Sequence, residues 1–249
     1  MLRLSLFVAV VTASFAVSQA NGTVITTKNK CNFTVWPGIF SGGEAKAMDL
    51  GGQGGYELPA GVSKSFPVPD NWSAGRIWGR TGCDFSKPAL EACNTGSCIG
   101  GLACTQPGLE PVTLAEFTLV PGGQDNYDLS LVDGFNLPLA IQPSAVGCPA
   151  PVCSKDINAD CPADLDIQGS NGVVVACKSS CLATSSHEFC CTGAHSTPDT
   201  CSPKGNPSYE VFKRNCPDAY AYAYDEGSGC LKTCRREGTA PDYTVVFCP

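Results

Sequence analysis

Charged side chains are scarce in this sequence, and basic ones are the scarcer of the two signs. Only 16% of the 249 residues are charged, and 16 Lys and Arg stand against 23 Asp and Glu, a formal net charge of −7. Binding to nucleic acid or to an anionic membrane surface needs clustered Lys and Arg, so the balance argues against both partners. The low charge content also argues against a charged, disordered chain.

Histidine is nearly absent, with only His187 and His195 in the whole chain. No Ser-His-Asp arrangement, phosphate-binding loop or GxGxxG motif is apparent. The chain is also rich in cysteine, but cysteines of a secreted protein pair in disulfides, so with only two histidines the sequence gives little support for a zinc site. We therefore expect no metal and no cofactor, and we interpret both histidines as surface or structural residues.

Long apolar runs are absent after residue 20. Residues 1–20 have the pattern of a signal peptide, with Arg3 before an apolar stretch and Ser18-Gln19-Ala20 offering small residues for cleavage. The stretch is too short for a spanning helix of ~20 residues. We expect a protein without a membrane span that is secreted and lies in the extracellular space or the cell wall.

Cysteine, in contrast, is abundant. The chain has 17 cysteines, which points to an oxidising compartment, and the odd number leaves at least one without a partner in the same chain. Three Asn-x-Ser/Thr sequons begin at Asn21, Asn32 and Asn71. We expect Asn32 to be unused because it falls in a predicted strand, and we keep Asn21 and Asn71 as candidate glycosylation sites.

Short strands broken by glycine turns dominate the pattern along the chain. Strands are predicted near 31–36, 75–81, 113–119, 127–132 and 219–225, with a glycine turn at 51–55. A helix is predicted from Asn171 as N-cap, because Val174, Cys177 and Cys181 would share one helical face. The fold class is all-β, a sandwich formed by residues 21–80, 112–147 and 217–249. Two cysteine-rich excursions interrupt it: a stapled loop at 81–111, and residues 148–216 with the short helix.

The cysteine spacings are specific. Cys83-x9-Cys93-x4-Cys98-x5-Cys104 is followed by Cys148-x4-Cys153-x7-Cys161, then by Cys177-x3-Cys181-x8-Cys190-Cys191, and Cys248 lies next to the last residue. With the segments 33–37, 75–81, 113–117, 128–136, 189–193 and 216–220, this framework resembles the thaumatin-like family, the osmotin-type pathogenesis-related proteins. The resemblance covers essentially the whole mature chain and implies an antiparallel β-sandwich.

The resemblance also implies a disulfide pairing, which spacing alone does not determine. The implied pairs are Cys31–Cys248, Cys83–Cys93, Cys98–Cys104, Cys148–Cys234, Cys153–Cys216, Cys161–Cys177, Cys181–Cys190 and Cys191–Cys201. Cys230 is left over, because Lys232-Thr233-Cys234 stands where the family has Phe-Thr-Cys. We expect a monomer, with dimerisation through Cys230 as an alternative.

The family fold implies an acidic cleft, whose lining residues correspond to Arg76, Glu116, Asp128, Asp133 and Asp225 here. Neighbouring carboxylates raise one another's pKa, and glycoside hydrolysis needs one protonated and one ionised carboxyl group. We predict Glu116 as the acid, because apolar neighbours on its strand would raise its pKa, and Asp128 as the ionised partner, with Asp225 as a substitute. Arg76 would hold one carboxylate ionised, and Asp133 would support the site or bind sugar hydroxyls.

Aromatic residues near the cleft have two possible roles. Sugar stacking and core packing both remain open for Phe117, Phe135, Tyr220 and Tyr222. The predicted function is endo-hydrolysis of β-1,3-glucan, the expected partner, in cell-wall remodelling or degradation. The alternative is a β-glucan-binding antifungal or defence protein without enzymatic activity.

Overall fold

The computed structural model describes residues 22–43, 54–236 and 240–249. The predicted signal peptide 1–20, Asn21 and most of the predicted turn at 51–55 therefore lie outside the described residues. Within those ranges, no helix is both long enough and apolar enough to cross a membrane.

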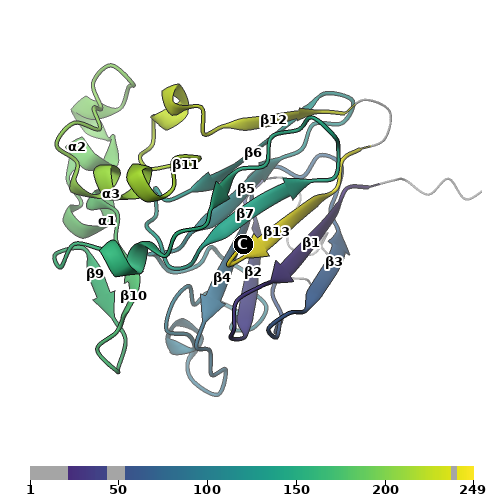
Figure 1. Ribbon diagram of the computed structural model, residues 1–249, viewed down its shortest axis with the longest axis horizontal. Coiled ribbons are helices and arrows are strands. Elements are labelled where there is room, and N and C mark those ends of the chain that lie inside the picture. Colours follow the sequence, from purple (N-terminus) through teal and green to yellow (C-terminus); the bar gives the residue numbers. More distant parts are fainter. Residues whose placement is uncertain (1–21, 44–53, 237–239) are drawn as a thin grey trace, which may run out of the picture.

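Two β-sheets packed face to face form the body of the molecule (Figure 1). The five-stranded sheet has the order β3-β1-β13-β7-β8, with β3 Ser63–Pro67, β1 Val24–Asn29, β13 Tyr243–Phe247, β7 Leu139–Pro143 and β8 Val152–Cys153. The six-stranded sheet has the order β11-β6-β5-β4-β2, and β12 also pairs with β6. Its strands are β11 Ala219–Tyr220, β6 Gln124–Ser130, β5 Leu114–Thr118, β4 Gly75–Thr81, β2 Val35–Ser41 and β12 Lys232–Arg235.

The predicted all-β sandwich is confirmed, with two parallel strand pairs added to the antiparallel pattern. Side chains alternate across each strand, so every second residue faces the other sheet. On β5, Ala115 and Phe117 point inward, and Phe117 stacks on Trp72 at a ring-centroid distance of 5.8 Å. On the same strand Glu116 points outward, which places it on the exposed face of the six-stranded sheet.

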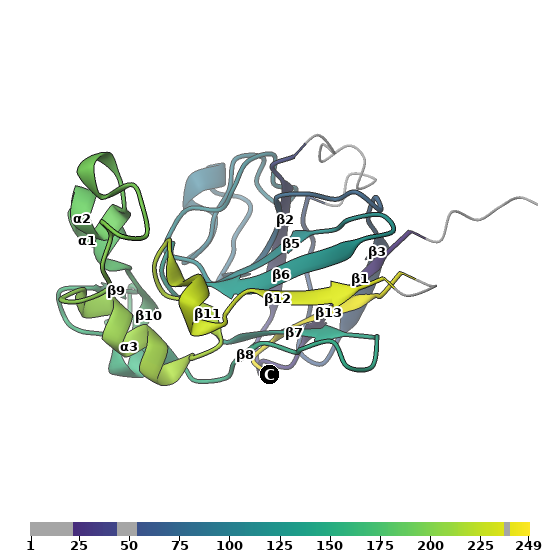
Figure 2. The same cartoon turned by 90° about the horizontal axis from the view of Figure 1, so that it is seen from above.

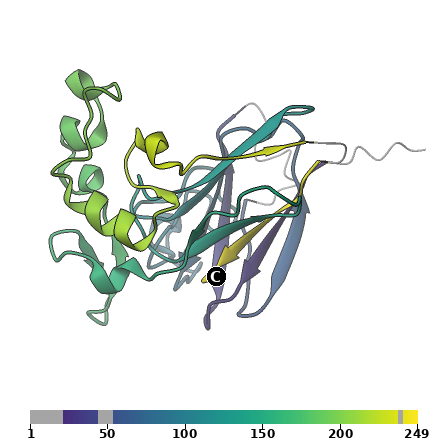
Figure 3. The same cartoon turned by 45° about the horizontal axis from the view of Figure 1, so that its top comes forward.

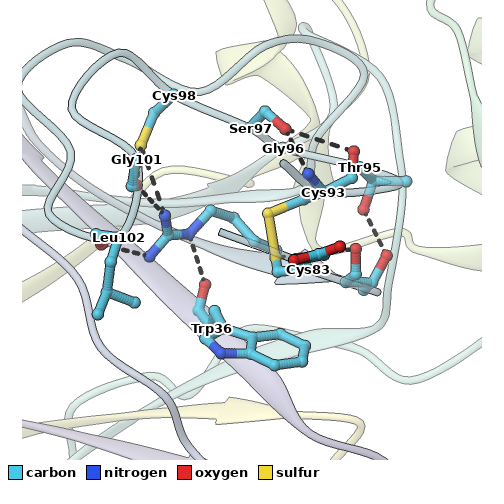
Figure 4. Close-up of a disulfide and its surroundings, with 12 residues drawn as sticks. Trp36, Cys83, Cys93, Thr95, Gly96, Ser97, Cys98, Gly101 and Leu102 are labelled. Atoms are coloured by element: carbon cyan, nitrogen blue, oxygen red, sulfur yellow. Dashed lines mark hydrogen bonds between the residues drawn. A yellow bond between two sulfur atoms is a disulfide. The ribbon is translucent and has the colours of Figure 1, made fainter. Parts of the chain in front are cut away.

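The stapled loop, residues 81–111, packs on the outer face of the six-stranded sheet and contains the short 3-10 helix η2, Ala89–Glu91. A second apolar cluster forms there from Trp78, Cys98, Cys104, Val112 and Leu114. Arg80 on β4 is fully buried, and its guanidinium donates to the carbonyls of Trp36, Gly101 and Leu102 (Figure 4). It also donates to the carbonyl of Pro37. Burial lowers the pKa of Arg80 to about 10, and the carbonyl oxygens take the place of water around the cation.

Residues 157–215 form a group of short elements at one end of the sandwich, as seen from above in Figure 2. These are η3 Ile157–Asp160, β9 Asp166–Gln168, β10 Val174–Cys177, α1 Ser180–Thr184, α2 His187–Cys190, η4 Gly193–His195 and α3 Pro207–Asn215. Disulfides hold the group together, because elements of this length bury too little surface to be stable alone.

The helix predicted from Asn171 is wrong over its first half. Val174–Cys177 is strand β10, which pairs with β9 in a hairpin. The Asn171 side chain accepts a hydrogen bond from the amide of Val173 inside the hairpin turn, so it organises a turn and not a helix. Gly172 has a φ of +75°, which suits this turn and breaks a helix. Only the end of the predicted segment, α1, is helical, and Ser179 is its N-cap.

The longest helix, α3, is one that the apolar pattern did not predict. Its N-cap Asn206 accepts a hydrogen bond from the amide of Tyr209, and Pro207 occupies the first helical turn. An N-cap Asn followed by Pro is a helix-start signal that could have found it. Val211 and Phe212 bury its inner face.

Eight disulfides link the chain, and they join the pairs implied by the family resemblance. Cys230 is free and its side chain is fully buried. An intermolecular disulfide through Cys230 would therefore require this segment to open first.

Two strand predictions extend too far. The strand predicted at 31–36 begins only at Val35, so Asn32 lies in an exposed bend, and the reason for expecting that sequon to be unused is wrong. Asn71 is also exposed and lies in a turn. The strand predicted at 219–225 ends after Tyr220, and the chain then bends into η5, Asp225–Ser228.

Candidate functional site

Three charged side chains form a row across the outer face of the six-stranded sheet. Arg76 on β4 is paired with Glu116 on β5, and Glu116 is paired with Asp128 on β6. Directly paired residues on one sheet face have Cβ atoms about 4.5–5.5 Å apart. The strand register therefore brings together residues that are 40 and 12 positions apart in the sequence.

Asp133 reaches this row from the turn that follows β6. Gly134 has a φ of +91° and donates its amide to the carbonyl of Leu131, which closes the turn and ends the strand. Arg76 lies between two carboxylates: its Nε is 3.0 Å from Glu116 and its Nη1 is 3.9 Å from Asp133. The guanidinium is the cation of the row, and it contacts Glu116 most closely.

The row forms one wall of a cavity of about 220 Å³. The other side of the cavity comes from β11, which pairs with β6 at the edge of the same sheet, and from the turn and η5 that follow it. Figure 3 shows η5 between the helices that precede β11 and the sandwich. The cavity is lined by Arg76, Glu116, Asp128, Ser130, Val132, Asp133, Tyr220, Ala223 and Glu226. Four of the five predicted cleft residues therefore meet at one site.

Asp225, the fifth predicted cleft residue, does not line this cavity. Its side chain is 3% exposed, and its Oδ2 lies 2.9 Å from Nζ of Lys213. The same oxygen accepts a hydrogen bond from the amide of Ala221. Asp225 thus turns inward behind the wall, and its neighbour Glu226 faces the cavity.

Burial and neighbouring charges act differently on the pKa values of the two central carboxyl groups, Asp128 and Glu116. Desolvation, with the nearby Glu116 carboxylate, raises the pKa of Asp128 to about 8, so this group keeps its proton at neutral pH. Desolvation also raises the pKa of Glu116, but the Arg76 guanidinium opposes the rise. The electrostatics therefore favour the reverse of the predicted roles, with Asp128 as the acid and Glu116 as the ionised group.

The pKa values of two further carboxyl groups, those of Asp133 and Glu110, are also raised by burial. Desolvation raises the pKa of Asp133, against the opposing effect of Arg76. Desolvation, followed by repulsion from Asp133, raises the pKa of Glu110. Burial thus raises the pKa of Asp133 and Glu110, as it does for Glu116 and Asp128.

Of the four aromatic candidates, two pack in the core, one lines the cavity and one packs against another tyrosine outside both. Phe117 and Phe135 are buried at 2% and 0% exposure, so they pack in the core and do not meet a ligand. Tyr220 lines the cavity. Tyr222 packs edge-on against Tyr209 with ring centroids 5.6 Å apart.

Sequence reasoning missed Glu226, Ser130 and Lys213. The family resemblance pointed to Asp225, the predicted strand 219–225 ended there, and Glu226 was left unconsidered. The adjacent acidic pair Asp225-Glu226 was the available signal, because successive side chains of the predicted strand would point to opposite faces.

Both histidines have local partners in residues 148–216. His187 Nδ1 lies 2.7 Å from Oγ1 of Thr192, and His195 Nδ1 lies 2.8 Å from the carbonyl oxygen of Thr200. Among residues 22–43, 54–236 and 240–249, no group of three or more His, Cys, Asp or Glu side chains is placed to hold a metal ion.

Comparisons with known proteins agree with the cysteine framework. Residues 29–249 match the Thaumatin family. The pathogenesis-related thaumatin-like protein 3.5 of Cryptomeria japonica is 46% identical over 94% of this chain and 93% of its own length. Pathogenesis-related protein 5 of Arabidopsis thaliana is 44% identical over 98% of this chain and 96% of its own. A glucan endo-1,3-beta-glucosidase of Prunus avium is 40% identical over 92% of each chain. The chain belongs to the thaumatin family.

Proposed function

We propose that this protein is a secreted endo-hydrolase of β-1,3-glucan, with Asp128 as the general acid and Glu116 as its ionised partner. The observation that carries the proposal is the unequal environment of these two carboxyl groups in one cavity. Hydrolysis of a glycosidic bond needs such a pair, one protonated and one ionised. The relative from Prunus avium that is named as a glucan endo-1,3-beta-glucosidase supports the choice of substrate.

The proton of Asp128 passes to the oxygen of the leaving sugar as the bond between that oxygen and the anomeric carbon breaks. Glu116 either attacks the anomeric carbon or takes a proton from the attacking water, and water supplies the oxygen of the new reducing end. Arg76 keeps Glu116 ionised through its 3.0 Å contact. Tyr220 offers an aromatic ring to a sugar in the same cavity.

Defence against fungi is the biological setting that we propose, because close relatives carry pathogenesis-related names. Eight disulfides fit an extracellular location, where such bonds form and persist. The alternative within the same setting is a protein that binds β-glucan without cleaving it.

The test is release of reducing ends from a linear β-1,3-glucan by the purified protein, with a β-1,4-glucan as the control polymer. We expect Asp128→Asn and Glu116→Gln to lower the rate about 10²–10⁴-fold, the usual contribution of a general acid or base. Exposed Asp164→Asn and Glu57→Gln make the same chemical changes away from the cavity and should leave the rate unchanged. Binding of the polymer without release of reducing ends between about pH 4 and 8 would establish the binding alternative.

The mutant pair also tests the assignment of roles. If wild-type protein cleaves the glucan and both variants match it, the hydrolase stands but Asp128 and Glu116 are not its catalytic groups. The configuration of the first product, followed by NMR, then distinguishes nucleophilic attack by Glu116, which retains the β-anomer, from attack by water, which gives the α-anomer.

A further inference from the structure

Glu226 lines the cavity from η5, on the side of the cavity that follows β11. It lies in the short 3-10 helix η5, and its side chain is exposed. Arg76 lies within 4.0 Å of both Glu116 and Asp133 on the sheet side. In the described part of the chain, no Lys, Arg or His nitrogen comes within 4.0 Å of the Glu226 carboxylate. Glu226 is thus an unneutralised negative charge at the cavity.

A buried ion pair sets the position of this wall. Nζ of Lys213, on α3, is 2.9 Å from Asp225 Oδ2 and donates to Ala219 O at 2.8 Å and to Ser228 Oγ at 2.7 Å. One ammonium group therefore ties α3 to β11 and to both ends of η5. The Ser228 hydroxyl also donates to the carbonyl of Asp225 at 2.8 Å, which closes the turn on itself.

The charges that line the cavity do not balance. Glu116, Asp133 and Glu226 are acidic and Arg76 is the basic lining residue, so the cavity is negative even while Asp128 keeps its proton. A carboxylate accepts hydrogen bonds from the hydroxyl groups of a neutral sugar without charge repulsion. The same carboxylate repels a sugar that carries its own carboxylate, more strongly where water is partly excluded.

We propose that Glu226, held in place by the Lys213–Asp225 pair, is a substrate-binding residue that makes the cleft select uncharged over anionic β-glucan. This inference rests on the proposed glucan site and adds to it a residue on the second wall. Glu226 selects because its charge is not neutralised, whereas Glu116 and Asp133 share the Arg76 guanidinium. Lys213 and Asp225 are positioning residues: they act through η5 and do not line the cavity.

The test compares two polymers with the same backbone, linear β-1,3-glucan and its carboxymethyl derivative, by equilibrium binding at low ionic strength. Wild-type protein should bind the neutral polymer more tightly. Glu226→Gln should reduce the ratio of the two affinities about five-fold, mainly by improving binding of the anionic polymer. Glu210→Gln, which removes an exposed acid on α3 away from the cavity, should keep the wild-type ratio.

High salt provides a second check. Salt screens the repulsion between Glu226 and the anionic polymer, so the ratio of the two affinities of the wild-type protein should approach that of Glu226→Gln. A wild-type ratio that Glu226→Gln leaves unchanged would overturn the inference. Because the measurement is binding, it is independent of turnover: a protein that binds with this selectivity but releases no reducing ends would refute the hydrolase and leave the role of Glu226 intact.

The positioning role is tested with Asp225→Asn, which can still accept the hydrogen bond from Ala221 but loses the charge that pairs with Lys213. We expect its affinity ratio to fall toward that of Glu226→Gln, with native near-UV circular dichroism. A folded Asp225→Asn protein with the wild-type ratio would show that the ion pair does not set the position of Glu226.

Discussion

The two walls of the cleft are positioned by different physical means. On one wall, Arg76, Glu116 and Asp128 stand on neighbouring strands, where backbone hydrogen bonds of the sheet set their spacing. On the other wall, Glu226 lies in a single 3-10 turn, and a buried ion pair behind it sets its place. Many backbone hydrogen bonds hold neighbouring strands together, so none of them is decisive, whereas an ion pair is lost when one partner is removed. We call the side formed by η5 the turn wall and the side formed by Arg76, Glu116 and Asp128 the sheet wall. A single substitution should therefore disturb the structure of the turn wall more than that of the sheet wall.

The largest expected effect is on the turn wall. Lys213→Met leaves the Asp225 carboxylate buried without its cation, which typically costs 3–5 kcal/mol, so we expect a loss of about 3 kcal/mol in the free energy of unfolding. Urea unfolding measures this loss. Lys204→Met, at an exposed site, is the control.

The double variant Lys213→Met/Asp225→Leu sharpens the result, because replacing both charges with apolar groups removes the unpaired charge. It should recover most of the lost stability. A single variant that loses less than about 1 kcal/mol would contradict the importance of the pair for the turn wall.

The six-stranded sheet that carries the charged row also holds a buried cation outside the cavity, Arg80, and loss of its guanidinium should have the next largest effect. Arg80→Lys keeps the charge but loses the planar fork that reaches four carbonyl groups. We expect a loss of about 2 kcal/mol, because carbonyl groups around the guanidinium lose partners while they stay buried. Thermal unfolding beside exposed Arg235→Lys measures it, and equal melting temperatures would contradict it.

The pH dependence of stability reports on the sheet wall itself. The pKa of Asp128 is about 8 in the folded protein and near 3.8 in an unfolded chain, so the folded state holds the extra proton between these values. The contribution of Asp128 to stability is therefore present at low pH and is lost as the pH rises from about 4 to about 8. Asp128→Asn should flatten this decline, and Asp164→Asn should not. Parallel curves for Asp128→Asn and wild type would contradict the raised pKa.

The smallest expected effect is a shift in the pH profile of glucan hydrolysis. Arg76 lowers the pKa of both Glu116 and Asp128, and it contacts Glu116 directly. In Arg76→Gln the acid limb should move up by about one pH unit and the alkaline limb by less. Arg214→Gln, exposed on α3, is the control. An acid limb that stays in place would mean that the ionisation of Glu116 does not limit the rate.

Much of the sheet wall could be predicted from the sequence, because strand residues alternate with a period of two. The β4 segment was predicted with the bounds that it has, and Glu116 and Asp128 were placed on strands correctly. The turn wall could not be predicted in the same way. The alternation of Ala and Tyr continues past Tyr220, but the chain leaves the sheet there and bends into η5, where Asp225 pairs with Lys213 of α3. A local pattern carries no information about a partner on another element.

The sequence by itself determined the β-sandwich, the family and, through the family resemblance, the eight disulfide pairs and four of the cleft residues. Alternation and cysteine spacing are local properties of the chain, so they can be read without coordinates. The tertiary structure alone decided which carboxyl group keeps its proton and which of Asp225 and Glu226 faces the cavity. Those choices depend on the reach of two cations, Arg76 toward Glu116 and Lys213 toward Asp225, and on how deeply each carboxyl group is buried.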